Sequence, residues 1–267
     1  MNHIEGVHLS DVQAVYSGPE GELWELIMGE QVHIGGMTSS MDLADKAGIA
    51  AGTQGVDLCC CTGGGMRFLV LMRKVARMRG VDATPTVIAR GRARNEKAGL
   101  QDKIEFVEAN VCQTGLPAGA ADFVWGEDAW CYVEDKFALA REAARIVRSG
   151  GTVAFTDWVE GKTPLTAEEA RRLLKFMKFP TLASLQDWRE LLSAAGLRVQ
   201  RAENTGRFAP HVDLYLEMIQ KQFTFDALRI IGFDQAMLQM LAGEMAFMQQ
   251  LAHNGKIVQG LFVAQKD

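Results

Sequence analysis

The chain has 267 residues, of which 48% are hydrophobic and 23% are charged, and its formal net charge is −5. These values are ordinary for a globular protein and exclude a disordered or fibrous chain. Lys and Arg are scattered and form no basic stripe, which disfavours nucleic-acid binding. No apolar run reaches the roughly 20 residues of a membrane-spanning helix. The first ten residues lack a basic stretch followed by an apolar one, so we expect no secretory signal.

Five cysteines are present, three of them consecutive at positions 59–61. Adjacent thiols cannot easily bridge each other, and the odd count suits a reducing compartment. We therefore expect a cytoplasmic protein without a disulfide framework. Successive strand residues point to opposite faces, so the three thiols cannot easily chelate one ion, and we expect no metal site.

Short β-type runs alternate with helical patterns, which predicts a parallel sheet covered by helices. Proline near the first turn and glycine after the last turn mark one helix clearly. In chain order, we expect a strand over 55–61, a helix over 66–77, a strand ending at 80–82, a helix over 84–98, strands over 104–107 and 122–125, a helix over 136–148, a strand over 152–156, a helix over 184–195, and strands over 197–203 and 256–264.

Two regions stand outside this alternation: residues 1–40 and residues 204–255. The second region is rich in Met and Phe, which suits a helical core stripe. The same composition suits a flexible apolar lid over a ligand, because Met adapts its shape to irregular surfaces. We expect an N-terminal cap over 1–40, a core over 41–203 and 256–267, and a helical substrate lid over 204–255.

A strand that ends in a glycine loop and then a helix is typical of a site for an anionic or nucleoside ligand. Here the loop Cys59–Gly65 matches neither G-x-G-x-x-G nor the Walker loop. Asp57 lies inside the strand, and Asp82 ends the next strand, where a carboxylate can bind both hydroxyls of a ribose. In the alternative interpretation, Asp82 is the N-cap of the following helix.

Several short motifs follow one another over residues 50–203, and their order and spacing are more specific than any one of them. They are V-D-L-x-C-x-T-G-G at Val56–Gly64, then Gly80–Asp82, Phe106–Asn110, Asp122–Trp125 and Ile146–Thr152. In this arrangement the chain resembles the class I S-adenosylmethionine-dependent methyltransferases. The resemblance implies an α/β, Rossmann-like fold: a seven-stranded, mostly parallel sheet with helices on both faces and an antiparallel last strand.

The N-terminal stretch narrows the resemblance. Tyr16, Trp24–Leu26 and Gly29–Gly35 look like the leader of the sarcosine/dimethylglycine N-methyltransferase group, and the insert before the last strand also suits that group. This implies an enzyme that uses S-adenosyl-L-methionine and releases S-adenosyl-L-homocysteine. Relatives with this leader act on different small molecules.

The resemblance also assigns residues to the cofactor. The loop after Asp57 would lie along the methionine part, Asp82 would bind the ribose, and Asn110 would meet the adenine amine, since an Asn oxygen can accept that hydrogen bond. Arg67 and His33 would approach the methionine carboxylate or close the cap over it. The cofactor-binding residues that the resemblance implies are Asp57, Cys59, Cys61, Gly63, Arg67, Asp82, Ala83, Asn110, Val111 and Glu127.

One departure from the family pattern lies in the glycine loop, where glycines are replaced by Cys59 and Cys61. A side chain at position 61 narrows the room for a ligand and restricts the backbone angles. A shifted cofactor, weaker binding, and a changed reaction on the same fold all stay open.

Methyl transfer from a sulfonium is an in-line displacement, so the protein has mainly to align the acceptor and exclude water. A base is needed only if the acceptor must lose a proton. The segment after the strand over 122–125 lies at the carboxyl edge of the sheet, where ligands bind. The candidate catalytic residues are Glu127, Asp128 and Tyr132 from this segment and His33 from the leader.

Trp130 and Tyr132 could hold a cationic or apolar acceptor by a ring face. Alternatively, Trp130 packs in the core. Arg207 could clamp a substrate carboxylate in a fork, or it could be a solvated surface residue. The remaining candidate substrate-binding residues in the insert are His211, Tyr215 and Met218.

We therefore expect an enzyme that transfers a methyl group to a small-molecule acceptor, with a glycine-like amine as the first choice. Methylation of an oxygen or carbon atom of an apolar natural product stays open. So do a non-methylating cyclase or lyase on the same fold and a cofactor-binding module without turnover. The expected partners are the small-molecule acceptor and at most a second copy in a homodimer, with no nucleic acid and no membrane.

Overall fold

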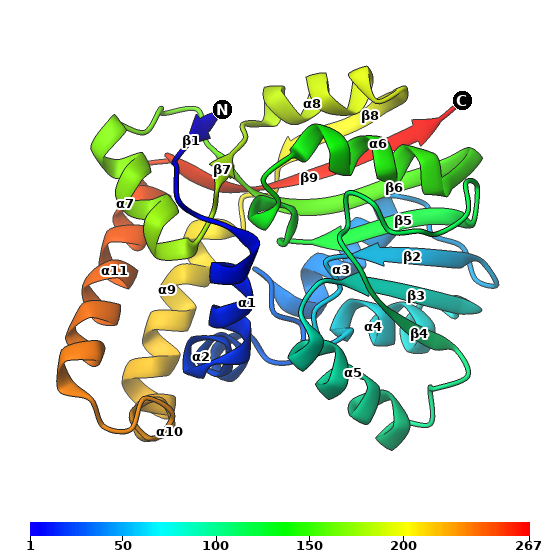
Figure 1. Ribbon diagram of the computed structural model, residues 1–267. Coiled ribbons are helices and arrows are strands. Elements are labelled where there is room, and N and C mark those ends of the chain that lie inside the picture. Colours follow the sequence, from blue (N-terminus) through cyan, green and yellow to red (C-terminus); the bar gives the residue numbers. More distant parts are fainter.

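The computed structural model describes residues 1–267, and its main feature is a seven-stranded sheet in the order β4-β3-β2-β5-β6-β9-β8 (Figure 1). Strand β9 runs antiparallel to both of its neighbours, whereas the other pairs are parallel. The expected fold class is therefore confirmed. The strands are β2 (Gln54–Leu58), β3 (Arg77–Asp82), β4 (Ile104–Glu108), β5 (Ala121–Glu127), β6 (Val147–Glu160), β8 (Leu197–Asn204) and β9 (Ile257–Lys266).

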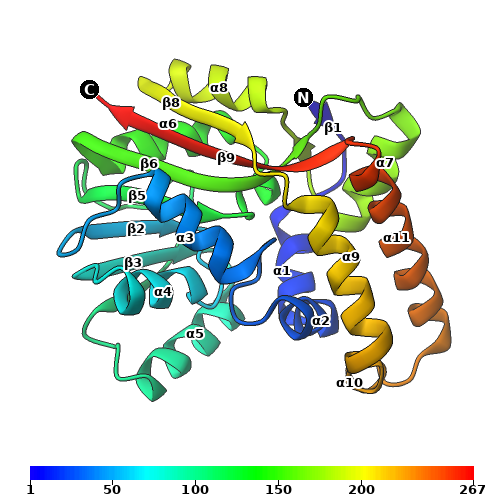
Figure 2. The same cartoon turned by 180° about the vertical axis from the view of Figure 1, so that it is seen from behind.

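The sheet has a hydrophobic core on each face, because successive strand residues point to opposite sides. On β5, Val124 belongs to one core, while Phe123 and Trp125 belong to the other. Figures 1 and 2 show helices on both faces of the sheet. Helices α6 (Lys136–Ile146) and α8 (Leu185–Ala194) complete the first core, and α3 (Gly36–Lys46), α4 (Gly64–Met72) and α5 (Pro85–Lys97) complete the second.

A second group of helices stands beside one end of the sheet, on the left of Figure 1. It brings the N-terminal segment next to the 204–255 insert, and a third core joins them through Ile27, Phe208 and Leu251. The proposed division into cap, core and lid stays a prediction. The elements of this group are β1 (Asn2–His3), α1 (Leu9–Ser17), α2 (Pro19–Met28), α7 (Ala167–Met177), β7 (Thr181–Leu182), α9 (Phe208–Met218), a π-helical turn (Ile219–Phe223), α10 (Thr224–Ile230) and α11 (Gln235–His253).

Several predicted boundaries were wrong by three or more residues. The strand expected over 55–61 ends at Leu58, so the three cysteines lie in the loop after it, and the strand expected over 152–156 begins at Val147. The helix expected over 66–77 ends at Met72, because Lys74 adopts a left-handed φ of 58° that turns the chain into β3. The strand expected over 152–156 extends to Glu160, because its last residues continue to pair with β9.

Helix α7 was missed although the sequence carries a signal for it. Thr166 and Glu169 form a capping box, in which each side chain accepts a hydrogen bond from the backbone N–H of the other residue. The pattern T-x-x-E before an apolar run predicts such a helix start.

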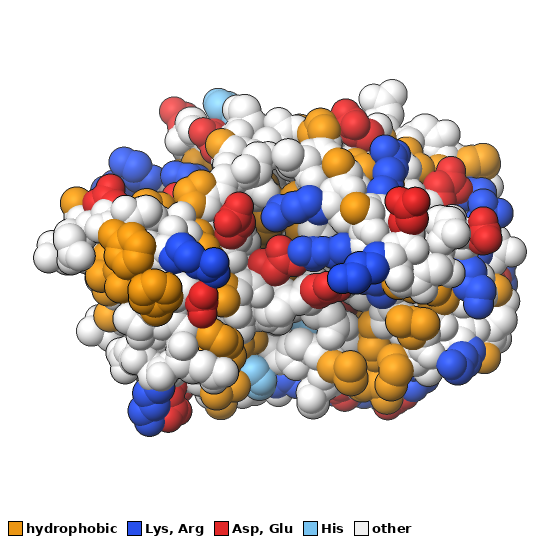
Figure 3. Space-filling model, turned by 90° about the horizontal axis from the view of Figure 1, so that it is seen from below, with side chains coloured by type: hydrophobic (Ala, Val, Ile, Leu, Met, Phe, Trp, Pro, Cys, Tyr) orange, Lys and Arg blue, Asp and Glu red, His pale blue; other side chains and the backbone are white.

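The surface differs between the two parts of the molecule. Figure 3 shows a group of hydrophobic side chains on the helical side, and on the sheet side many charged side chains together with a further hydrophobic group. The exposed hydrophobic residues of the insert include Phe225, Phe233 and Met240. None of the helices combines the length and the apolar content needed to cross a membrane.

Candidate active site

A cavity of about 670 Å³, here called the main cavity, lies at the carboxyl ends of β2, β3, β4 and β5, beneath α1 and the segment Glu30–His33. Ligands of open α/β sheets bind at this edge, where neighbouring strands diverge. Most of the residues predicted from the strand ends line this cavity together. The predicted residues among its lining are His33, Asp57, Cys59, Cys61, Asp82, Ala83, Asn110, Val111, Glu127, Asp128 and Tyr132.

The cysteine loop keeps the backbone shape that glycine favours. Cys59 and Cys61 have φ values of 64° and 47°, in the left-handed region. For a residue with a side chain this conformation costs about 1–2 kcal/mol. Both side chains line the main cavity without filling it, so the loop leaves room for a ligand.

Asp82 ends β3 and ties the loop to the next helix. Its two carboxylate oxygens accept hydrogen bonds from the backbone N–H groups of Cys61 and Thr84, each at 2.9 Å. The N-cap of α5 is Thr84, so the interpretation of Asp82 as that cap was wrong. A carboxylate has about four acceptor sites, so Asp82 can also receive two ligand hydroxyls. Burial raises its pKa, and the backbone donors oppose that rise.

A second group of carboxylates surrounds the first turn of α4. Burial, and then the charges of Glu127 and Asp82, raise the pKa of Asp57 well above its usual range. A Cβ on Gly65 would collide with Glu127 Oε2, so only glycine leaves this space open. The buried Nε1 of Trp125 beside it has no hydrogen-bond partner. These groups fit a ligand that carries both a cationic amine and polar atoms.

Glu127 and Asp128 are adjacent but have different partners. Glu127 Oε1 accepts a hydrogen bond from Ser40 at 2.6 Å and lies 3.3 Å from His33 Nε2. Asp128 accepts from the backbone N–H of Ile34 at 2.8 Å, and burial raises its pKa. The two carboxylates therefore do not form an acid/base pair.

A pair of tyrosines, Tyr16 and Tyr132, lines the main cavity. The hydroxyl of Tyr16 donates to that of Tyr132 at 2.9 Å, and the rings meet edge to face. Burial raises the pKa of both phenols, so both stay protonated at neutral pH. The pair can therefore offer a hydrogen-bond donor to an acceptor molecule, but it cannot act as a base.

Three predicted residues near the loop do not line the main cavity. Trp130 is fully buried, stacks on Phe155 and donates to the carbonyl oxygen of Leu58 at 3.2 Å, so the interpretation that it packs in the core is confirmed.

Arg67 donates to the carbonyl oxygen of Thr62 and to Glu30, both at 2.7 Å. Arg67 therefore fastens the N-terminal segment that carries Glu30 to the loop over residues 59–65. Gly63 is the N-cap of α4, with φ of 80°.

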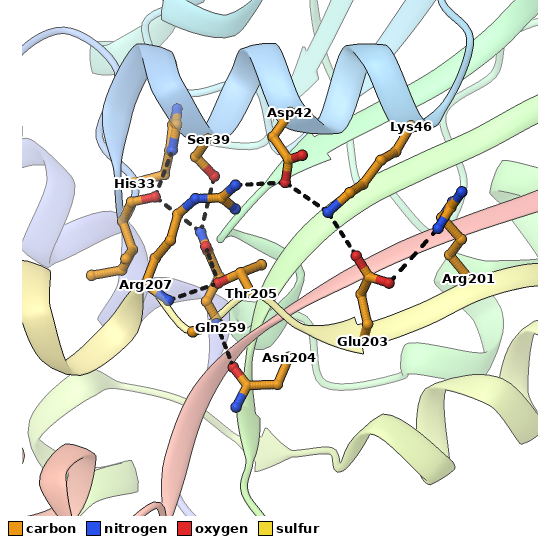
Figure 4. Close-up of polar contacts among 12 residues, drawn as sticks. His33, Ser39, Asp42, Lys46, Arg201, Glu203, Asn204, Thr205, Arg207 and Gln259 are labelled. Carbon is orange, nitrogen blue, oxygen red and sulfur yellow. Dashed lines mark hydrogen bonds and ion pairs between the residues drawn. The ribbon is translucent and has the colours of Figure 1, made fainter.

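The four candidates from the insert also lie outside the main cavity. Figure 4 shows Arg207 reaching Asp42 of α3, and Lys46 joining Asp42 to Glu203. Arg207 therefore braces α9 against α3 and does not clamp a carboxylate in this cavity. His211 Nδ1 lies 2.9 Å from the carbonyl oxygen of Arg207.

Tyr215 and Met218 support the helical side of the molecule. The Tyr215 hydroxyl accepts from the backbone N–H of Gly35 at 3.2 Å and donates to the carbonyl oxygen of His33 at 3.4 Å. Met218 packs against the core that joins the insert to the leader. Tyr215 therefore holds the turn that carries His33, and neither side chain lines the main cavity.

Several lining residues escaped the sequence analysis. Tyr16 and the segment Glu30–Val32 line the main cavity, although the sequence pointed to them only through the resemblance of the N-terminal stretch and not as site residues. They lie far along the chain from the strand ends. Lys136 also lines the main cavity, and its ammonium donates to backbone carbonyls of Cys131, Val133 and Thr181. That ammonium is already well supplied with acceptors.

A methyltransferase domain, as defined by its family model, matches residues 56–155, from β2 into β6. Dimethylglycine N-methyltransferase of Parasynechococcus marenigrum is 26% identical over 237 residues, which cover 80% of this chain and 81% of that protein. The 27-O-demethylrifamycin SV methyltransferase of Amycolatopsis mediterranei is 26% identical over 168 residues, which cover 62% and 61%. The solved structure of phosphoethanolamine N-methyltransferase 2 of Haemonchus contortus, in complex with S-adenosyl-L-methionine, has a TM-score of 0.85 at 20% identity, covering 98% of this chain and 60% of that one.

Residues 56–155 match a methyltransferase domain, and the seven-stranded sheet with its antiparallel strand is the fold that the sequence motifs imply. The resemblance to the class I S-adenosylmethionine-dependent methyltransferases is therefore confirmed. The chain spans 46–61% of the length of three of the curated relatives that it matches.

Proposed function

We propose that the protein transfers a methyl group from S-adenosyl-L-methionine to a small-molecule acceptor in the main cavity. The observation that carries the proposal is the set of polar side chains at three successive strand ends. Asp57, Asp82 and Asn110 all line this cavity, next to the N-terminus of α4. Carboxylate and amide acceptors at this edge suit the amine, ribose and adenine of a nucleoside ligand.

Each of these residues has a proposed role in binding. Asp82 receives the ribose hydroxyls, because its oxygens are fixed by two backbone donors and keep free acceptor sites. Asn110 and Val111 line the place of the adenine. Asp57 and Glu127 attract the cationic amine, which would lower the repulsion between their charges.

The bound cofactor supplies an electrophilic methyl group on a sulfonium. The protein then has to orient the acceptor and to exclude water. Tyr16 and Tyr132 orient the acceptor through their hydroxyls and rings. The link between Arg67 and Glu30 holds the leader over the loop and keeps water out. If the acceptor carries a proton that must leave, we propose Glu127 as the base that receives it. His33 lies beside Glu127 in the main cavity.

An amine nitrogen, as in glycine derivatives, is the acceptor that the sequence resemblance implies. The Tyr16 and Tyr132 rings support it, since aromatic faces attract cationic amines. The charged side chains that line the main cavity do not favour an acceptor that carries a carboxylate. No arginine lines the main cavity, and the ammonium of Lys136 is held by backbone carbonyls. We therefore favour an amine without a carboxylate.

A second candidate is methylation of an oxygen or carbon atom on an apolar molecule. A specific observation favours it: Tyr132 also lines a second cavity, whose walls are mostly apolar. An acceptor that reaches across Tyr132 would place its apolar part there.

Binding and turnover test the proposal separately. Calorimetry with S-adenosyl-L-homocysteine tests the cofactor site, and transfer of labelled methyl groups to a panel of amines, phenols and apolar alcohols tests the reaction. We expect saturable binding and labelled product. Binding without labelled product would favour a cyclase, a lyase or a binding module, and absence of binding would overturn the proposal.

A further inference from the structure

The insert and the N-terminal helices border a second space between α2, α9, the π-helical turn, α10 and α11. It is partly open to solvent, because Ala242 and Ala246, which line it, are exposed. This helical cavity measures about 240 Å³, and 16 of its 19 lining residues are hydrophobic. Glu20 is the only charged residue among them, and no Lys, Arg or His lines it. Burying an anion without a partner is costly, so this space does not suit a phosphate or a carboxylate.

The sequence of α11 leaves this space open. Leu238, Leu241 and Met245 face the helical cavity at spacings of one turn, and Ala242 and Ala246 share that wall. Residues three or four apart lie on one helix face. Small alanine side chains on that face leave volume that larger residues would fill, and the neighbouring leucines stay only half-buried. An apolar ligand would remove this surface from water, which is favourable at about 25 cal/mol per Å².

The helical cavity adjoins the main cavity at a single side chain. Tyr132 lines both spaces, and its hydroxyl is bonded to that of Tyr16. From the helical side, Trp24 and Ile27 of α2 and Met177 of α7 complete the wall near this point. A molecule that spans Tyr132 would have one end beside the strand-end carboxylates and the other among apolar side chains.

We propose that the helical cavity binds the apolar part of the methyl acceptor, an uncharged aromatic or branched aliphatic group, while its reacting atom lies in the main cavity beside Tyr132. This substrate class rests on the proposed function. Its size follows from the volume: an apolar cavity of about 150 Å³ can hold benzene, so about 240 Å³ suits a group somewhat larger than one ring.

Two features of the wall suit a ligand of variable shape. The segment Ile219–Phe223 forms a π-helical turn, and Ile219 and Gln220 line the helical cavity. Such turns occur inside α-helices and are frequent at functional sites. Met177 and Met245 add thioether side chains that adapt to irregular surfaces.

The test uses 1-naphthol as the uncharged probe and 1-naphthyl phosphate as its charged counterpart. Both are titrated by calorimetry into the full-length protein in the presence of S-adenosyl-L-homocysteine. We expect one saturable site for 1-naphthol and at least tenfold weaker binding of the phosphate. Failure of 1-naphthol to saturate up to its solubility limit, or equal affinity for the two probes, would overturn the proposal.

Variants that fill the helical cavity test whether 1-naphthol binds there. Ala246→Leu and Ala242→Leu add volume on the cavity wall, and each is expected to weaken 1-naphthol binding at least tenfold. Ala236→Leu is the matched control, since Ala236 lies on the same helix and is exposed like Ala242 and Ala246 but does not line the cavity. It should bind within twofold of the wild type. Unchanged affinity in the folded cavity-filling variants would place the probe elsewhere and refute the site. Two variants keep the test decisive if one of them fails to fold.

The cofactor site is a separate readout. S-adenosyl-L-homocysteine should bind the Ala246→Leu variant within twofold of the wild type, because the strand-end carboxylates are untouched. Conversely, Asp82→Ala should lose cofactor affinity and keep 1-naphthol binding when it is titrated without cofactor. If the wild type binds 1-naphthol but no S-adenosyl-L-homocysteine, the proposed function fails while the apolar site stands. Loss of both ligands in Ala246→Leu would contradict the separation of the two sites.

Discussion

The hydroxyl groups of Tyr16 and Tyr132 are bonded at 2.9 Å although the residues lie 116 positions apart in the sequence. One comes from helix α1 of the leader and the other from the short turn after β5. Both residues line the main cavity. Their contact also marks the boundary with the helical cavity, which Tyr132 lines as well.

Tyr132→Phe should lower kcat about tenfold and leave the affinity for S-adenosyl-L-homocysteine within twofold. The ring stays, but the acceptor loses a positioning hydroxyl and Tyr16 loses its partner, at a cost of about 1–3 kcal/mol. Initial rates of labelled methyl transfer measure the effect. Tyr16→Phe should behave alike, and the double variant should be little worse than either single one, since the two hydroxyls share one bond. Additive losses would show that the tyrosines act independently.

Asp82→Ala should weaken S-adenosyl-L-homocysteine binding about 10- to 100-fold. The substitution removes charged hydrogen bonds worth about 1–3 kcal/mol, while the strand around it keeps its backbone pairing. Calorimetry measures the affinity, and circular dichroism checks the fold. Asp102→Ala is the matched control, because Asp102 is exposed in the turn before β4 and should bind like the wild type. Unchanged affinity in the Asp82 variant would refute the ribose assignment.

Cys61→Gly should be more stable than Cys61→Ala by about 1 kcal/mol. Both variants lose the thiol, but only glycine adopts a positive φ without steric cost, and Cys61 has φ of 47°. The free energy of unfolding in urea measures the difference. Equal stability of the two variants would mean that the loop carries no strain at this position.

The stability of the protein should depend on pH through Asp157. This carboxylate is fully buried on β6, accepts hydrogen bonds from the backbone N–H of Cys131 and from Trp188, and burial raises its pKa to about 7. The unfolded value is about 4. Between these values the folded state keeps its proton and the unfolded state loses it. The contribution of Asp157 therefore falls as pH rises from about 4 to 7, by about 4 kcal/mol at most, and stays level above that.

Asp157→Asn isolates this contribution. The amide cannot ionise, so the free energy of unfolding should fall less between pH 4 and 7 than it does in the wild type. The free energy of unfolding of the variant will be lower at every pH. The NH₂ group of the amide points at an N–H donor, in a place where the carboxylate oxygen accepted a hydrogen bond. The pKa of Glu142 is lowered to about 2, mainly by its bond to Arg145. The stability that Glu142 contributes therefore rises with pH above about 2, and it does so equally in the wild type and in the variant. Parallel pH profiles would contradict the raised pKa of Asp157.

The fold class could be predicted because it depends on short-range patterns. Alternating apolar residues and glycine turns marked the strands, and strand ends of a parallel sheet meet at one edge. For that reason the strand pattern pointed to Asp57, Asp82 and Glu127, and the family resemblance added Asn110; all four line one cavity. The missed boundaries, such as the end of α4, depend on left-handed residues that no periodic pattern reveals.

The neighbours Trp130 and Tyr132 show where local patterns stop being informative. Both are aromatic residues of the same short turn, yet Trp130 stacks on Phe155 in the core while Tyr132 lines both cavities. Likewise, nothing near Arg207 in the sequence points to its partner Asp42, which lies 165 positions away.

The amino-acid sequence by itself determined the α/β architecture, the family and the carboxylates at the sheet edge, since local sterics and hydrophobic periodicity act over a few residues. Only the tertiary structure decided which aromatic and charged side chains face the two cavities, because packing between distant segments sets where each of them finds its partner.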